Sequence, residues 1–554
     1  MSIELKREFI ERLREELPYA KVIVLNYEDV LVEIPPTKLR ETVEIVQNRF
    51  KCLLRTCAAS DEREMNKSFA MYYIFGNDSL GLNIIVKTMA DSENPVLPSI
   101  SDISFAADWC ELEAYDLMGI RFSGRKLYRF ILPPSWPEGL YPLRKDVKYP
   151  LRVKASVTGE RIGLTREAEA QILVPLGPYH PALHEPEYFE LLVEGERVVG
   201  LVYRGFHVHR GIEKIAEVKL TYDQIPFLAE RICGICGFTH STAYCQAVEK
   251  AAKIDTPERA QYIRSILLEI ERIHSHLLWI GVVCHILGYD AGFMHLWRIR
   301  ERVMVLAEKL TGSRKMYSIN KIGGIRRDID RDRVKEVQET LSKLKKEFMS
   351  IIDVITSVPE IVKRLKGTGI LPRSEALKYA VVGPVARGSG LKRDVRKDYP
   401  YAAYREVSFD IPVYTEGDNL ARFLVRVEEV KQSIAIIEQL LDKLPGGPIC
   451  ISRVSVPEGI IAVSATEAPR GENVHFIITG RGRPYRWRVR APTYQNIPAL
   501  NVMLKDTPLA DAPITIASID PCFSCTDRII VVDVKTGRRR VLVSSVAGGV
   551  LSHG

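Results

Sequence analysis

Two cysteine pairs that lie far apart in the chain constrain its fold most strongly. Each pair has the spacing C-x-x-C, with Cys233 and Cys236 in the first pair and Cys522 and Cys525 in the second, within a chain of 554 residues. A C-x-x-C turn directs two soft thiolates at one point, so two such turns brought together form a cup of four sulfur atoms suited to a transition metal. We therefore expect a fold that joins two segments hundreds of residues apart.

A structural zinc ion and a redox-active metal centre both use four thiolates. Zinc ribbons usually hold their pairs within about 15–20 residues of each other, and these pairs are much further apart. Both pairs are also flanked by reactive groups that a structural zinc ion does not need, namely Arg231, Thr239, His240, Asp520, Asp527 and Arg528. Spacing alone leaves zinc open as an alternative.

Composition argues against several other classes of protein. The chain is 46% hydrophobic and 27% charged with a net charge of +8, as in a globular protein large enough for two or more domains. Its basic runs are not interleaved with aromatic residues, so we expect no nucleic-acid binding. The N-terminus has no apolar signal region, no run is suited to span a bilayer, and the ten cysteines are scattered. These features indicate a cytoplasmic chain that reaches a membrane only through partners.

Hydrophobic periodicity predicts an α+β protein with two main domains. Residues 1–150 alternate between strands and helices, as in a mixed α/β domain. Residues 151–170 are polar and poorly periodic, which indicates a linker. Residues 171–528 are predicted to form a mainly helical domain with small peripheral sheets. Its long helices are expected within residues 257–312, 330–366 and 417–444.

The residues around the two cysteine pairs resemble those of the large subunit of nickel–iron (NiFe) hydrogenases. The first motif reads R-I-C-G-I-C-G-x-x-H and the second reads D-P-C-x-x-C-T-D-R. They are most similar to the energy-converting branch related to respiratory complex I, which includes formate hydrogenlyase and the membrane-bound hydrogenases. Most other branches have histidine where Arg528 stands here.

A second resemblance covers the N-terminal domain. The motif E-x-x-x-x-D-x-x-G-I runs from Glu111 to Ile120, and P-L-R-K-D follows at residues 142–146. Both segments are similar to the 30-kilodalton subunit of complex I, which is fused to the large subunit in formate hydrogenlyase. The resemblance implies a domain that docks onto neighbouring subunits and has no chemistry of its own. The segment after the linker is similar to both hydrogenase large subunits and the 49-kilodalton subunit of complex I.

The resemblance to hydrogenases implies a nickel–iron centre. All four cysteines would bind nickel, and Cys236 and Cys525 would also bridge to an iron that carries cyanide and carbon monoxide ligands. His240 would hydrogen-bond a bridging sulfur. Pro492 and Thr493 would line the diatomic ligands of the iron.

The resemblance also implies residues that handle protons. Arg470, in the motif E-A-P-R-G, and Asp520, close to Cys522, would lie opposite the open coordination position of nickel. The proton acceptor is then either a terminal thiolate or Arg470 itself. His184 stands where proton-conducting relatives have glutamate and quinone-reducing relatives have histidine. Either His184 or the adjacent Glu185 is therefore the candidate proton gate.

Two further positions carry alternatives. Glu213, in H-R-G-I-E, matches a glutamate that helps to hold a structural divalent ion in uptake hydrogenases. Because Arg528 replaces the histidine that shares this ion, Glu213 is expected either to bind an ion or to pair with a basic group. His274 and His276 are two residues apart and so lie on different faces of a helix, and we interpret them as structural.

The resemblance further implies the catalytic subunit of a membrane-associated complex that forms or oxidises hydrogen reversibly. The chain has no ferredoxin-type cysteine run, so iron–sulfur clusters are expected only in partners, namely a small subunit with a four-iron cluster and a ferredoxin-like subunit. Integral membrane subunits and nickel-insertion factors are implied too. A maturation protease would remove the extension 529–554 after Arg528. The complex would lie on the inner face of the cell membrane.

One alternative function uses the same scaffold. Related subunits of complex I-like oxidoreductases pass electrons from NAD(P)H or ferredoxin to quinone, or reduce sulfane sulfur. Such relatives have lost or altered one or more of the four cysteines, whereas all four are present here.

Overall fold

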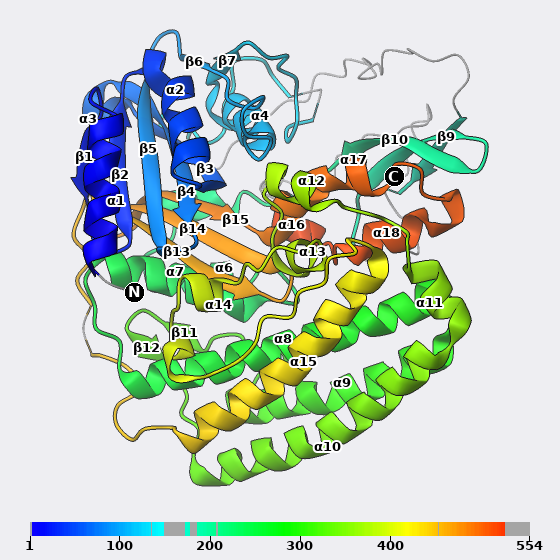
Figure 1. The fold of residues 1–554 in the computed structure, drawn as a ribbon. Coiled ribbons are helices and arrows are strands. Elements are labelled where there is room, and N and C mark those ends of the chain that lie inside the picture. Colours follow the sequence, from blue (N-terminus) through cyan, green and yellow to red (C-terminus); the bar gives the residue numbers. More distant parts are fainter. Residues whose placement is uncertain are drawn as a thin grey trace, which may run out of the picture.

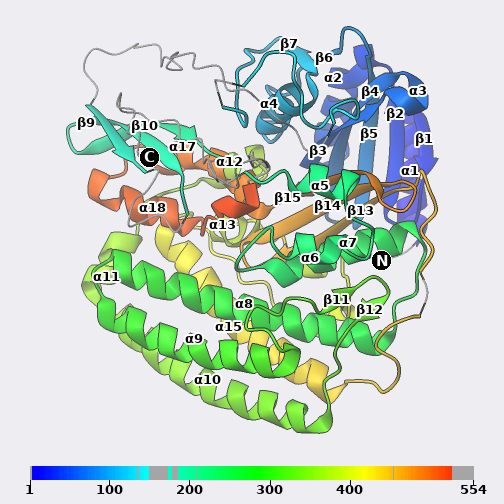
Figure 2. The same ribbon diagram turned by 180° about the vertical axis from the view of Figure 1, so that it is seen from behind.

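Two packed regions make up the computed structural model, an N-terminal α/β domain and a larger helical domain (Figures 1 and 2). The structure describes residues 3–133, 136–148, 172–177, 185–206, 209–452 and 454–526. The predicted linker 151–170, His184, Arg528 and the extension 529–554 lie outside the described residues. The prediction of a multidomain protein with helices and several small sheets is confirmed.

The N-terminal domain is built on a five-stranded sheet with the order β1-β2-β5-β4-β3. Its strands are β1 (Lys21–Val24), β2 (Asp29–Ile34), β3 (Leu53–Glu62), β4 (Ser68–Asn77) and β5 (Leu82–Asp91). Strands β2 and β5 run parallel and the other neighbours run antiparallel. Strand β3 is therefore an edge strand, and its backbone groups on one side need partners from elsewhere.

Both faces of this sheet are covered, because side chains alternate between the faces along each strand. On β2, Val30 and Val32 share a core with helices α1 (Ile3–Glu16), α2 (Leu39–Glu44) and α4 (Ala107–Met118). Leu31 points to the opposite face, where it joins Phe476 in a second apolar cluster. The second face thus packs against the larger domain.

Four long helices form the core of the larger domain, in the lower half of Figure 1. They are α8 (Glu258–Ile286), α9 (Asp290–Thr311), α10 (Arg331–Ser357) and α15 (Asn419–Asp442). The predicted helical segment 257–312 forms two helices, because Gly288 between them has φ +79°. The predicted segment 330–366 likewise forms α10 and α11 (Pro359–Leu365), since Pro359 lacks the N–H that would continue α10.

A three-stranded sheet lies between the helices and the N-terminal domain. It consists of β13 (Ile461–Ala468), β14 (Gly471–Thr479) and β15 (Pro484–Arg490) in the order β13-β14-β15. Every residue of β14 is buried. One face packs on the N-terminal sheet, and Ile477 on the other face packs with Val248 of α7 (Gly237–Ala251). The expectation of a peripheral sheet is therefore wrong for these strands, because a second domain covers the face that would otherwise be exposed.

The remaining elements are short and connect these layers. A second sheet contains β8 (Ile172–Leu176), β9 (Tyr188–Glu194) and β10 (Arg197–Arg204). Other elements are α3 (Arg63–Asn66), β6 (Val96–Pro98), β7 (Arg121–Ser123), α5 (Ile212–Val218), α6 (Ile225–Ala229), β11 (Asn320–Lys321), β12 (Gly324–Ile325), α12 (Arg373–Lys378), α13 (Gly383–Gly388), α14 (Val395–Asp398), α16 (Pro492–Asn496), α17 (Leu500–Met503) and α18 (Ala512–Ser518). Across the described part of the chain, no helix combines the length and the apolar character that crossing a bilayer requires.

Candidate metal centre

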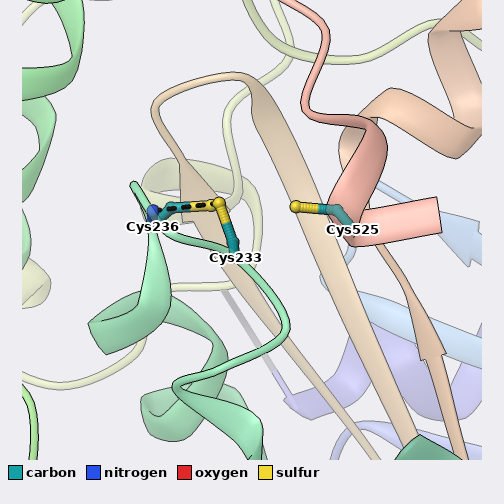
Figure 3. Close-up of side chains that lie close together, drawn as sticks. All are labelled: Cys233, Cys236 and Cys525. Carbon is teal, nitrogen blue, oxygen red and sulfur yellow. Dashed lines mark hydrogen bonds between the residues drawn. The ribbon is translucent and has the colours of Figure 1, made fainter. Parts of the chain in front are cut away.

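The fold brings the four predicted cysteines together in the interior. The Sγ atom of Cys233 lies 3.2 Å from that of Cys522, which lies 2.8 Å from that of Cys525. The sulfur atoms of Cys233, Cys236 and Cys525 all lie within 4.8 Å of one another (Figure 3). All four side chains are buried. This donor set, soft, compact and shielded from water, fits a nickel–iron centre and also fits zinc.

The first pair sits in the loop between α6 and α7. The Sγ atom of Cys233 accepts hydrogen bonds from the backbone N–H groups of Ile235 (3.3 Å) and Cys236 (3.2 Å). Helix α7 begins directly after Cys236, so its positive end faces the sulfur atoms and stabilises thiolate charge. Gly237 has no room for a side chain, because an added Cβ atom would lie 2.4 Å from the carbonyl oxygen of Glu230.

Glu271 of α8 anchors this loop, although nothing in the sequence singled it out. Its carboxylate accepts hydrogen bonds from the backbone N–H groups of Phe238 (2.8 Å) and Thr239 (2.9 Å), and from the Thr239 hydroxyl. These N–H groups belong to the first turn of α7 and would otherwise lack partners. Burial raises the pKa of Glu271 to about 8. The sequence signal is weak because this glutamate lies in the middle of a helix.

The second pair follows a sharp turn at Asp520, which has φ +53°. The backbone N–H of Cys522 donates to the hydroxyl oxygen of Thr493 at 3.0 Å. Thr493 follows Pro492, which opens the short helix α16, where its missing N–H costs nothing. The structure therefore places Thr493 against the second cysteine loop. The predicted contacts of Pro492 and Thr493 with diatomic ligands stay predictions.

Arg470 and Asp520 lie together beside the cysteines. The guanidinium of Arg470 donates to the backbone oxygen of Asp520 at 2.7 Å and to its carboxylate at 2.8 Å. It also donates to the hydroxyl of Ser275 at 3.1 Å. Arg470 is 2% exposed. All three nitrogen atoms of the buried guanidinium thus hold fixed partners, so its position is set by α8 and by the loop that precedes Cys522.

His240 is buried on α7 with one ring nitrogen unused. Its Nδ1 atom lies 3.3 Å from Nε2 of His475, and Trp487 donates to Nδ1 of His475 at 3.3 Å. Nε2 of His475 also lies 3.3 Å from the side-chain nitrogen of Asn473. Burial lowers the pKa of His240 to about 4, so the ring is neutral. Within the described part of the structure, Nε2 of His240 has no hydrogen-bond partner.

Glu185 reaches the second cysteine loop. It accepts a hydrogen bond from the backbone N–H of Ser524 at 2.7 Å and another from the Ser524 hydroxyl. Ser524 lies between Cys522 and Cys525 in the chain. The predicted site residue Glu185 therefore contacts a residue that is adjacent in the chain to Cys525.

Glu213 lies on α5 and pairs with basic groups. It contacts Arg486 at 2.7 Å and Arg488 at 3.5 Å, and it accepts from the backbone N–H of Val489 at 3.1 Å. This is the second of the two outcomes expected from the sequence. A divalent ion at Glu213 stays a prediction.

Arg210 joins the two cysteine loops, a role that sequence reasoning missed. One of its terminal nitrogens donates to the backbone oxygens of Ile232 (2.8 Å) and Ser524 (2.7 Å), which belong to the first and second loop respectively. The available signal was its place in H-R-G-I-E, beside Gly211, whose φ of +63° turns the chain.

His276, interpreted as structural, contacts Glu429 of α15 at 2.8 Å.

Three family models match most of the chain. Residues 32–153 match the family model of the respiratory-chain NADH dehydrogenase 30 Kd subunit, and residues 287–457 and 450–528 match that of the 49 Kd subunit. Residues 210–285 match the model of the nickel-dependent hydrogenases. The segment 210–285 contains the first cysteine pair.

Individual relatives come from both hydrogenases and complex I. The chain is 39% identical to formate hydrogenlyase subunit 5 of Escherichia coli, covering 97% of this chain and 96% of that protein. It is 35% identical to an NADH-quinone oxidoreductase subunit of Phocaeicola vulgatus, covering 87% of this chain and 96% of that protein. A solved chain of the archaeal membrane-bound sulfane sulfur reductase matches with a TM-score of 0.62 and 35% identity, covering 65% of this chain and 99% of that chain.

The fold and the buried cysteine cluster define an oxidoreductase subunit of the hydrogenase and complex I type. The chain belongs to the complex I-related family of nickel–iron hydrogenase large subunits, with a domain like the 30-kilodalton subunit of complex I fused at its N-terminus. Both resemblances predicted from the sequence are confirmed.

Proposed function

We propose that this chain is the catalytic subunit of a nickel–iron hydrogenase that forms or oxidises dihydrogen reversibly. The observation that carries the proposal is the meeting of four buried sulfur atoms, with Sγ–Sγ distances of 3.2 Å between the two pairs and 2.8 Å within the second pair. This chain contains all four of the cysteines that the resemblance to hydrogenases requires.

The cysteines would hold the metals, and nearby side chains would tune them. When bound, a nickel–iron centre supplies a Lewis acid and a redox metal for the heterolytic cleavage of dihydrogen. Cys233, Cys236, Cys522 and Cys525 would hold the two metals. Nε2 of His240, which has no partner among the described residues, would donate a hydrogen bond to one of the cysteine sulfurs.

Arg470 and Asp520 would act beside the metals that the cysteines hold. Their bidentate contact holds a fixed positive charge in a dry site, where it favours negative charge that develops on a reacting group. The sequence left a thiolate or Arg470 as the proton acceptor. Because the Arg470 guanidinium is already protonated and all three of its nitrogens donate hydrogen bonds, the proton would be taken by a cysteine thiolate. Glu185, which is hydrogen-bonded to Ser524 in the second loop, would receive that proton, and His184, its neighbour in the sequence, is the alternative proton gate.

The chain would work within a membrane-associated complex. In the described residues, the cysteines of the two pairs form the one cluster of metal-type ligands, so electrons would leave through iron–sulfur clusters of partner subunits. Named relatives include subunits of membrane-bound hydrogenase and respiratory complexes, which supports attachment to a membrane through partner subunits. The complex would lie on the inner face of the cell membrane. A nickel-dependent maturation protease would remove residues 529–554.

Hydrogen-dependent dye reduction by the complex, purified anaerobically, tests the proposal. We expect dihydrogen to reduce the dye, and Cys525→Ser to abolish the reaction. The second candidate, reduction of quinone or sulfane sulfur, is supported by the similarity to complex I and to the sulfane sulfur reductase. Quinone or polysulfide reduction without any hydrogen-dependent activity would favour that candidate and overturn the proposal.

A further inference from the structure

The acidic motif of α4 contains three buried carboxylates that face in different directions. Glu111 accepts a hydrogen bond from the backbone N–H of Ile100 at 2.8 Å. Asp116 accepts from three successive backbone N–H groups of residues 130–132, at 2.8, 2.7 and 3.0 Å. These partners all belong to the N-terminal domain. Glu113 instead reaches into the larger domain, so it is the member of the motif whose role lies outside its own domain.

Glu113 links two elements of the larger domain. One carboxylate oxygen accepts from the guanidinium of Arg488 on β15 at 2.6 Å, and the other accepts from the hydroxyl of Tyr494 on α16 at 2.9 Å. Glu113 is 5% exposed. A buried carboxylate with a charged partner and a hydroxyl partner holds both in fixed positions, because each would lose a hydrogen bond without replacement by water.

Tyr494 extends this link to the cysteines. Its ring is 3% exposed, belongs to the hydrophobic core of the N-terminal domain and packs edge to face on Trp109 at 5.4 Å between centroids. Its neighbour in α16, Thr493, accepts the hydrogen bond from the backbone N–H of Cys522. The N-terminal domain therefore holds α16 through Tyr494, and α16 holds the second cysteine loop through Thr493.

Arginines on β15 fix the register between this strand and the edge strand β3, where the two domains meet. Their Nε atoms donate to alternate backbone oxygens of the edge strand β3, with Arg486 on Ala59 (2.7 Å), Arg488 on Cys57 (3.0 Å) and Arg490 on Arg55 (2.7 Å). Both strands contribute every second residue, so a shift by one residue would turn all three arginines away from β3. Glu113 neutralises the middle arginine of this ladder.

We propose that Glu113 is a positioning residue of the metal centre, contributed by the N-terminal domain, which holds the Cys522 loop in place through Tyr494 and α16. That Glu113 supports a metal centre rests on the proposed function. The series of contacts that leads from Glu113 through Tyr494 and Thr493 to Cys522 is the same whichever metal binds. A domain expected to serve only for docking thus completes the support of the second cysteine loop.

Hydrogen–deuterium exchange on the full chain in its purified complex tests this inference without relying on activity. Material from nickel-depleted and nickel-replete cells is compared for wild type, Glu113→Gln, Tyr494→Phe and the control Glu111→Gln. Tyr494→Phe keeps the ring packing and removes only the hydroxyl. We expect exchange in residues 491–496 and 519–526 to rise about fivefold in both test variants, as loss of a buried hydrogen bond predicts. Glu111→Gln should raise exchange near Ile100 and leave these two segments unchanged.

Infrared bands of the metal-bound diatomic ligands give a second readout in nickel-replete material. We expect shifted or broadened bands in Glu113→Gln and Tyr494→Phe, and wild-type bands in Glu111→Gln. Unchanged exchange at 519–526 in both test variants, or an equal rise in Glu111→Gln, would overturn the inference. If wild-type material contains no nickel, the proposed function fails, but the exchange data still decide whether Glu113 positions the loop.

Discussion

Replacing Glu472 by glutamine should lower the free energy of unfolding, because this residue joins the two domains. Glu472 of β14 is 4% exposed, and its carboxylate contacts Arg55 of the N-terminal domain at 2.7 Å and Arg490 of β15. Burial alone would raise its pKa, but the charges of Arg55, then of Arg490 and Arg393, outweigh burial and lower the pKa to about 2. The difference from an ordinary value of 4.5 corresponds to about 3 kcal/mol of stability at neutral pH.

The loss of unfolding free energy in Glu472→Gln should decrease as the pH falls. Because the pKa of Glu472 is lower in the folded state, its contribution is present above pH 4.5 and is lost as the pH falls towards 2. The difference in unfolding free energy between wild type and Glu472→Gln should therefore shrink from about 3 kcal/mol at pH 7 to about 1 kcal/mol at pH 3.

Urea unfolding followed by fluorescence at pH 7, 5 and 3 measures this difference. The matched control is Glu33→Gln, since Glu33 pairs with Lys21 at 3.2 Å in a contact whose side chains are 35% and 72% exposed. Such a surface pair contributes less than about 1 kcal/mol. The reasoning is refuted if Glu472→Gln costs no more than Glu33→Gln at pH 7, or if its cost is the same at all three pH values.

Three further predictions concern the cysteine loops and the tail. Arg210→Lys should lower the nickel content of the purified complex about tenfold with little change in melting temperature. Lysine is shorter and lacks the second terminal nitrogen, which donates to the backbone oxygen of Arg231 and so fixes the nitrogen that joins the two loops. An equal nickel content by mass spectrometry would contradict this. Thr493→Val should destabilise the chain by about 1–3 kcal/mol, since the N–H of Cys522 loses its acceptor, whereas Thr493→Ser should unfold like wild type. The intact mass of active enzyme should correspond to a chain ending at Arg528, and an active chain that still contains residues from Ile529 onward would exclude maturation by cleavage.

Local patterns predicted much of the fold. The strands at β4 and β5 and the helices α8, α10 and α15 follow from periodicities of two and 3.6 residues. The burial of β14 could not be predicted in this way. Its polar residues Glu472, Asn473 and His475 suggest an exposed strand, and they are buried because their partners come from other segments, as with Arg55 and Trp487.

The candidate site divides in a similar way. The cysteines and Arg470 stand in dense motifs, so a resemblance could identify them. Glu271 and Glu113 could not be identified, because each acts on a partner that only the tertiary structure brings near. Glu113 and Tyr494, for example, are 381 positions apart in the chain. Sequence spacing carries no information about such a contact.

The nickel content of the anaerobically purified complex, measured together with iron and zinc by mass spectrometry, tests the central claim most directly. The account predicts one nickel per chain in wild type, and loss of nickel in Cys525→Ser, because four converging thiolates are required to hold it. Zinc in place of nickel in the wild-type complex, or an undiminished nickel content in Cys525→Ser, would contradict the account.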